Sequence, residues 1–112
     1  MASRPSLHPD AAQNLALAMV ACSEVPLLLL DGDLTVISAS ASFCRSFQLD
    51  PASVADRSLF ALGAGEWNGR QLQALLKATR SGVADIQAYE MDLNRDGKEP
   101  RRLVINARRL EF

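Results

Sequence analysis

Residues 26–37 read PLLLLDGDLTVI, and this stretch gives the clearest local indication of the fold. The unbroken apolar run Leu27–Leu30 suits a strand that is buried on both faces. The run is followed by the turn formers Asp31–Asp33, and then by Leu34–Ile37, which is rich in β-branched residues. The stretch therefore predicts a β-hairpin.

A second pair of extended segments is predicted at residues 85–93 and 101–110, with Asp96-Gly97 as the turn signal between them. The later segment alternates apolar and polar residues from Leu103 onward, as a strand with two different faces does. The earlier segment loses this alternation at Ala88–Tyr89. A β-bulge at that point would account for the loss.

Two short helices are predicted after the first hairpin. Ser40 can cap one whose Phe43 and Phe47 lie four residues apart and so share a face. Asp50 followed by Pro51 marks the start of another brief helical turn.

A longer helix is predicted to begin at Asn68 and to stop at Gly82. Its apolar stripe follows the i, i+3, i+4, i+7 spacing and comprises Leu72, Leu75, Leu76 and Thr79. The order of elements predicts an α+β domain in which helices cover one face of a single antiparallel sheet.

Another helix is predicted near the N-terminus, from the N-cap Asp10, with Gln13 completing a capping box, to about Cys22. Residues 1–9 are interpreted as a disordered leader, and residues 10–112 as one domain. The helix is apolar almost all round, which favours one side packed on its own domain and another on a second subunit. The alternative is a helix tucked wholly into its own core. The candidate dimer contacts are Leu15, Met19 and Cys22.

The composition is that of an ordinary globular chain: 112 residues, 48% apolar and 22% charged, with a net charge of −1. This balance gives no basic footprint for nucleic acid. The apolar runs are too short to span a bilayer, and the N-terminus lacks a secretory signal pattern. We therefore expect a cytoplasmic domain with no membrane span in this chain.

Residues 62–68 read LGAGEWN, residues 89–90 read YE, and residues 105–110 read INARRL. These three stretches resemble a PAS domain, in particular the sensor domain that precedes the kinase core in bacterial histidine kinases of the HWE and related groups. The likeness covers about residues 24–112. Its motifs are a Gly-x-Gly-x-Trp-Asn turn, an aromatic-Glu pair and an Asn-Ala-Arg-Arg stretch. The candidate signalling residues on these motifs are Glu66, Trp67, Asn68, Tyr89, Glu90, Asn106, Arg108 and Arg109.

The resemblance implies a sensory and dimerising input domain of a two-component signalling protein, most directly a sensor histidine kinase. The domain would enclose a small cavity and pass a conformational change to an effector or kinase domain elsewhere in the parent chain. A homodimer is implied, and a small-molecule ligand is left open. The alternative is a protein–protein interaction module whose core is filled by its own side chains.

One departure from the family concerns the sheet. A PAS sheet has a fifth strand between the first and the fourth, whereas this sequence ends at Phe112 without one. Unpaired backbone groups in a buried sheet are costly. Either the first and fourth strands pair directly, or a partner chain completes the sheet, or the domain is truncated at its C-terminal end.

The sequence offers little for catalysis or metal binding. The only histidine is His8, in the expected leader, so neither a zinc cluster nor haem through histidine is expected. Cys44 precedes Arg45 but lacks the position and flanking residues of a cysteinyl-flavin sensor. Cys22 and Cys44 are expected to be reduced, and a redox role is left open. Glu66 beside Trp67 is the strongest single candidate, against the alternative that Trp67 packs in the core and Glu66 favours a helix N-terminus. No enzyme is predicted, and the cofactor is unknown.

Overall fold

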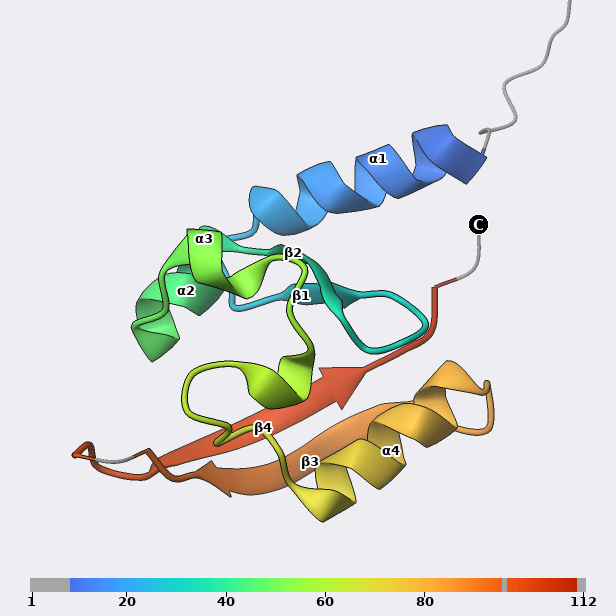
Figure 1. Cartoon of the computed structure of the whole chain (residues 1–112). Coiled ribbons are helices and arrows are strands. Elements are labelled where there is room, and N and C mark those ends of the chain that lie inside the picture. The colour runs from blue at the N-terminus through green and yellow to red at the C-terminus, as the bar shows by residue number, and fades with distance from the viewer. Residues whose placement is uncertain (1–8, 96, 111–112) are drawn as a thin grey trace, which may run out of the picture. The chain divides into compact units, whose positions relative to one another are not determined.

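The computed structural model describes residues 9–95 and 97–110, and these fall into two compact units (Figure 1). The first contains residues 9–31 and 36–56, with the elements α1 (Pro9–Ala21), β1 (Leu28–Leu30), β2 (Val36–Ala39), α2 (Ala41–Phe47) and α3 (Pro51–Val54). The second contains residues 32–35 and the rest of the described chain, with the 3₁₀ turn η1 (Leu59–Ala61), α4 (Arg70–Arg80), β3 (Ile86–Leu93) and β4 (Arg101–Ala107). The α+β class is confirmed.

The four strands do not form one sheet. The described strands pair as two separate antiparallel hairpins, β1 with β2 and β3 with β4. The prediction of a single sheet was therefore wrong, and so was the option that the first and fourth strands pair directly. A local turn joins the two strands of each hairpin, and no described strand pairs with strands of both hairpins.

In the first unit, α1 packs against both β1 and β2 (Figure 1). The helix begins at Pro9, one residue before the predicted cap, so Asp10 is not the N-cap. Proline is suited to a first helical turn because its φ is already helical and its missing N–H has no partner there. The other residues of the expected leader, 1–8, lie outside the described chain.

Ser40 joins two parts of this unit. Its buried hydroxyl accepts the N–H of Phe43 at 3.0 Å, which caps α2 as predicted. The same oxygen accepts the N–H of Leu27 at 3.0 Å and donates to the carbonyl of Val25 at 2.9 Å. The rings of Phe43 and Phe47 then pack with their centroids 4.9 Å apart.

The next helical turn also begins as predicted. The Asp50 side chain accepts the N–H of Ala52 at 3.0 Å, with Pro51 in the first turn of α3.

In the second unit, the loop 32–35 departs from the predicted strand. Leu34 has φ 62° and is buried, so the strand begins two residues later, at Val36. The carbonyl of Leu34 accepts the N–H of Leu59 at 3.0 Å, and Thr35 makes an isolated antiparallel bridge with Ser58. These long-range contacts hold a leucine in a conformation that its side chain disfavours.

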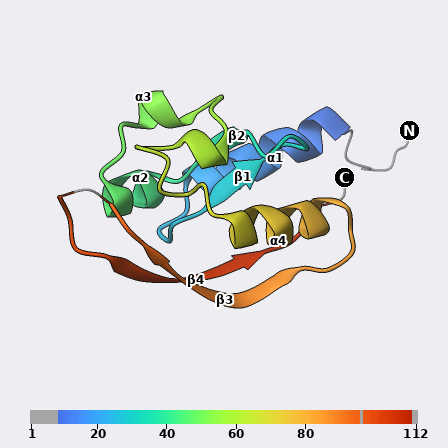
Figure 2. The same cartoon turned by 60° about the horizontal axis from the view of Figure 1, so that its bottom comes forward.

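The helix α4 packs against β3 (Figure 2). Its N-cap is Gly69, which makes no side-chain capping bond, so the prediction that Asn68 begins the helix was wrong by two residues. The predicted stop at Gly82 is confirmed, with φ 78°. The N–H of Gly82 bonds to the carbonyl of Thr79, and that of Val83 to Ala78, which is a Schellman motif.

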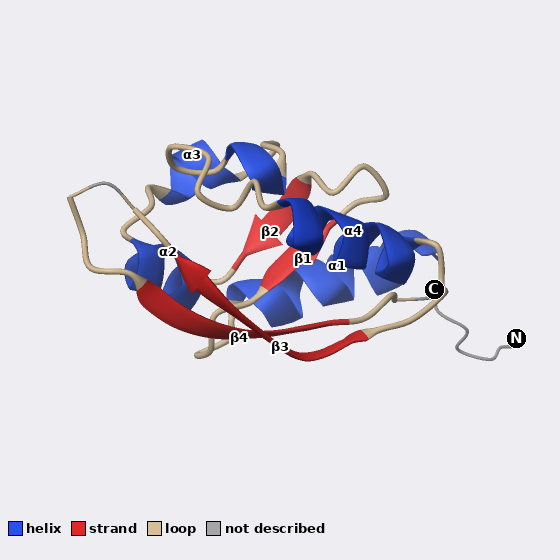
Figure 3. Ribbon diagram, turned by 90° about the horizontal axis from the view of Figure 1, so that it is seen from below, coloured by secondary structure: helices blue, strands red, loops and turns tan. Residues whose placement is uncertain are grey.

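The β3–β4 hairpin is a strongly twisted ribbon, as two-stranded sheets are (Figure 3). Its register slips between Ile86 and Tyr89, which confirms the predicted bulge, and Ala88 has φ 52° at that point. The strand β4 ends at Ala107. Arg108 and Arg109 therefore lie beyond the strand on which we placed them.

Candidate functional site

The outer face of α1 is the most exposed apolar surface on a regular element of the first unit. Leu15 and Met19 are 51% and 65% exposed, and Cys22, just past the helix end, is exposed as well. Leu17 and Val20 are half-buried on the same helix, which packs on β1 and β2. The alternative of a helix wholly covered by its own core does not hold.

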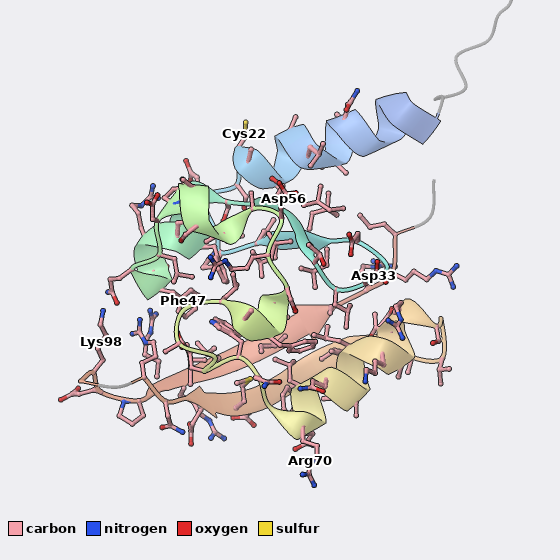
Figure 4. The ribbon with its side chains drawn as sticks, viewed as in Figure 1. Cys22, Asp33, Phe47, Asp56, Arg70 and Lys98 are labelled. Carbon is pink, nitrogen blue, oxygen red and sulfur yellow. The ribbon has the colours of Figure 1, made fainter. Side chains whose placement is uncertain are left out.

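The three candidate dimer contacts share one helical face. They are spaced i, i+4 and i+7, so their side chains follow one line along the helix. Figure 4 shows the Cys22 sulfur directed away from β1 and β2. This face offers apolar area and a thiol but no charged group, and is suited to packing rather than catalysis.

The glycine turn before α4 is organised by Glu66. Its carboxylate accepts the N–H of Ala64 at 2.8 Å and lies directly over Gly63. Gly63 has φ 60°, and a Cβ at this position would overlap the carboxylate. The Glu66 carboxylate therefore binds a backbone N–H of its own loop. It does not cap the N-terminus of α4, which was the alternative expected from the sequence.

The two residues that follow Glu66 have different surroundings. Trp67 is 5% exposed and belongs to the buried set of the second unit, as expected for a core tryptophan. Asn68 is exposed, and its side-chain oxygen accepts a hydrogen bond from the Gln73 amide in the first turn of α4. The three residues shape the turn that leads into α4.

Asn106 completes the β3 bulge. Its side-chain oxygen accepts the N–H of Ala88 at 2.9 Å, so the amide that the bulge displaces from the ladder has a partner. Tyr89, next to the bulge, is half-buried and lies opposite Ile105. Asn106 was predicted only as a motif residue, and the bulge was predicted separately. The sequence indicated the motif residue and the bulge, but it did not indicate that Asn106 bonds to the bulge.

Charged residues occupy the outer face of this hairpin. Arg102 pairs with Asp92 at 3.1 Å and with Glu90 at 3.3 Å, and all three side chains are more than half exposed. The hydrogen bond to Asp92, followed by that to Glu90, raises the pKa of Arg102, which stays protonated. Solvent screens such pairs, so they position the side chains more than they stabilise the fold. Arg102 lies directly opposite Asp92 and diagonal to Glu90, which itself lies opposite Val104.

The last two motif residues, Arg108 and Arg109, are exposed. The Arg109 guanidinium approaches Gly82, where an added Cβ would lie 2.8 Å from Nη1. Arg109 thus lies at the C-terminal end of α4, where a positive charge is favourable.

Cys44 is buried in α2. Burial raises the pKa of its thiol, and the charge of Asp50 adds to the effect. The described cysteines are both free. Between residues 9 and 110, leaving out 96, no group of three or more His, Cys, Asp or Glu side chains is placed to hold a metal ion. His8 lies outside this range.

Among the described helices, none is long and apolar enough to cross a bilayer. No protein-family model matches the sequence, and comparison with curated proteins finds no significant match.

Proposed function

We propose that this chain is a PAS-type sensory and dimerisation domain of a bacterial signal-transduction protein, most directly a two-component sensor histidine kinase in the cytoplasm. The observation that carries the proposal is the exposed apolar face of α1, on a helix that also packs against its own hairpin. The succession of helix, hairpin, short helices, longer helix and hairpin is compatible with that family.

The α1 face bears on dimerisation because it is continuous. Leu15, Met19 and Cys22 present a line of apolar atoms to solvent. In a symmetric dimer, this line packs against the same line of the second copy. Burial of this line in a symmetric pair removes apolar area from water on both subunits. A dimer built in this way would transmit a change in the domain through the orientation of α1. No catalytic step is assigned to this chain.

The test is the concentration dependence of the molar mass, measured by light scattering. The wild-type chain is expected to dimerise, and Met19→Glu and Leu15→Glu are expected to shift the equilibrium to monomer, because each places a charge in the apolar contact. Val83→Glu is the matched control, since Val83 is 77% exposed but lies outside α1. A monomer at all concentrations, or equal weakening by Val83→Glu, contradicts helix-mediated dimerisation.

The alternative is a protein-interaction module without a small-molecule ligand. It is favoured by the aromatic packing in the first unit, where Phe43 and Phe47 fill buried space with the protein's own rings. Native mass spectrometry of the purified chain separates the two functions. A bound compound of defined mass supports sensing, and a chain of unliganded mass supports the interaction module.

A further inference from the structure

Asn68 is followed directly by Gly69, in the exposed segment that leads into α4. Asparagine is a thermolabile residue, because the backbone nitrogen of the next residue can attack its side-chain carbonyl carbon, Cγ. The attack closes a five-membered ring, and a side chain on the next residue hinders the closure. Glycine has no Cβ, and its backbone is the most free to turn. The pair therefore joins a reactive side chain to its least hindered neighbour.

The backbone nitrogen of Gly69 lies outside the helical ladder of α4. Gly69 is the N-cap of the helix, with φ −94° and ψ 139°, and makes no side-chain capping bond. Its N–H donates to the carbonyl of Trp67 at 2.9 Å, which closes a turn of three residues. A local turn of this kind can open while the helix stays folded. The attacking nitrogen is thus held by a local bond and not by the bonds of the helix.

Gln73 acts on the other reacting group. Its side-chain amide, in the first turn of α4, donates a hydrogen bond to the side-chain oxygen of Asn68. Negative charge develops on this oxygen when a nitrogen attacks Cγ. A donor that is already aimed at the oxygen lowers the energy of the charged intermediate.

The other described asparagines lack this combination. Each is followed by a residue with a side chain, in the pairs Asn14–Leu15, Asn94–Arg95 and Asn106–Ala107. Asn14 lies within α1, and the side-chain oxygen of Asn106 is bonded to the N–H of Ala88. Asn94 lies just beyond β3 and is exposed, as Asn68 is, so it is the matched comparison within the same chain.

We propose that Asn68 is a site of deamidation, with water as the co-reactant and Gln73 as the donor to the oxygen that becomes charged. The nitrogen of Gly69 bonds to Cγ of Asn68 and loses its proton, and the side-chain amide leaves with that proton as ammonia. Water then opens the ring at either of its two carbonyls, which gives aspartate or isoaspartate. A neutral amide of the motif turn becomes a carboxylate. The site does not depend on dimerisation or on the proposed signalling function.

The first test is peptide mapping by mass spectrometry, after incubation of the folded chain in warm, mildly alkaline buffer. The peptide with Asn68 should gain about 1 Da and separate by chromatography into an aspartate and an isoaspartate form. It should react at least about tenfold faster than the peptide with Asn94, a difference of about 1.4 kcal/mol in the barrier. Equal rates at the two asparagines, or no conversion of Asn68, overturn the proposal.

The second test changes the attacking residue. Gly69→Ala should slow the conversion of Asn68 about tenfold, equivalent to about 1.4 kcal/mol. The structure accommodates this alanine, because its Cβ would meet no atom within 4 Å and the φ at this position is negative. Gly32→Ala is the matched control, since its Cβ also has open space, and it should leave the rate unchanged. An unchanged rate in Gly69→Ala overturns attack by the residue 69 nitrogen.

The third test removes the donor. Gln73→Ala should slow the conversion of Asn68 about threefold, as expected for the loss of one exposed hydrogen bond. Gln71→Ala is the control, because Gln71 is an exposed glutamine in the same turn of α4. Circular dichroism checks that both variants fold. A rate in Gln73→Ala equal to or above that of the wild type overturns the role assigned to Gln73.

Discussion

The side-chain oxygen of Asn106 accepts the backbone N–H of Ala88 across the β3–β4 hairpin, at 2.9 Å. Asn106 lies on the regular strand, and Ala88 lies in the bulge of the other strand with φ 52°. Asn106, one of the motif residues, therefore stabilises the bulge, because it accepts a hydrogen bond from the backbone N–H that the bulge removes from the ladder.

Asn106→Ala is expected to lower the free energy of unfolding by about 1 kcal/mol, because it removes one hydrogen bond at an exposed position. The Ala88 amide should also exchange faster, which NMR can follow at that single site. Asn106→Asp keeps the accepting oxygen and should retain protection of Ala88. If Ala88 exchanges at the same rate in Asn106→Ala and the wild type, the bond does not stabilise the bulge.

Ser40→Ala is expected to lower the free energy of unfolding by about 2 kcal/mol. The substitution removes the buried cap of α2 and leaves the N–H of Leu27 without its acceptor in a partly buried setting. Ser53→Ala, which removes one exposed hydroxyl bond to the Asp50 carbonyl, is the control and should cost less. Urea unfolding of the three proteins measures the difference. Equal losses for the two variants would show that Ser40 does no more than an exposed serine.

Gly63→Ala is expected to destabilise the chain more than Gly65→Ala. Both glycines have positive φ, which costs an alanine about 1 kcal/mol, but only at Gly63 would the new Cβ overlap the Glu66 carboxylate. That carboxylate would then move and release the N–H of Ala64.

The Glu66→Ala background isolates this contact. With the carboxylate absent, the two glycine substitutions should cost similar amounts in thermal or urea unfolding. A persistent excess cost at Gly63 would mean that its backbone, and not the approach of Glu66, demands glycine.

The stability of the chain should fall at alkaline pH through Cys44. Because burial raises the pKa of this thiol, the folded chain keeps a proton that the unfolded chain releases. The stabilisation is complete below the thiol's ordinary pKa and is lost as the pH rises through the raised value. The slope approaches at most about 1.4 kcal/mol per pH unit.

Urea unfolding across this pH range measures the slope. Cys44→Ala should flatten it, whereas Cys22→Ala, at the exposed cysteine, should leave it unchanged. A thiol reagent should label Cys22 in the folded monomer much faster than Cys44. Equal slopes in the wild type and Cys44→Ala would remove Cys44 as the cause.

Several parts of the fold were predictable because their signals are local. Ser40 caps α2, Asp50 caps α3 and Gly82 ends α4, each through bonds to residues at most four positions away. Both hairpins, and the bulge at Ala88, follow from turn residues and from a break in alternation within one segment.

Long-range contacts account for what was missed. Leu34 was placed in a strand because its neighbours are β-branched, but its conformation follows from bonding to Leu59. Glu66 is a different case, because its contact is local. It was weighed as a functional or helix-capping carboxylate, whereas the glycine turn folds its side chain back onto Ala64, two residues away.

The amino-acid sequence was sufficient for the type and order of most secondary elements and for several of their ends, because turn chemistry and apolar periodicity act over a few residues. The tertiary structure decided that the hairpins form two sheets and that Asn106 supports the bulge. These outcomes depend on which segments far apart in the sequence come into contact. The residues next to an apolar or amide side chain in the sequence do not determine which distant residue it will contact.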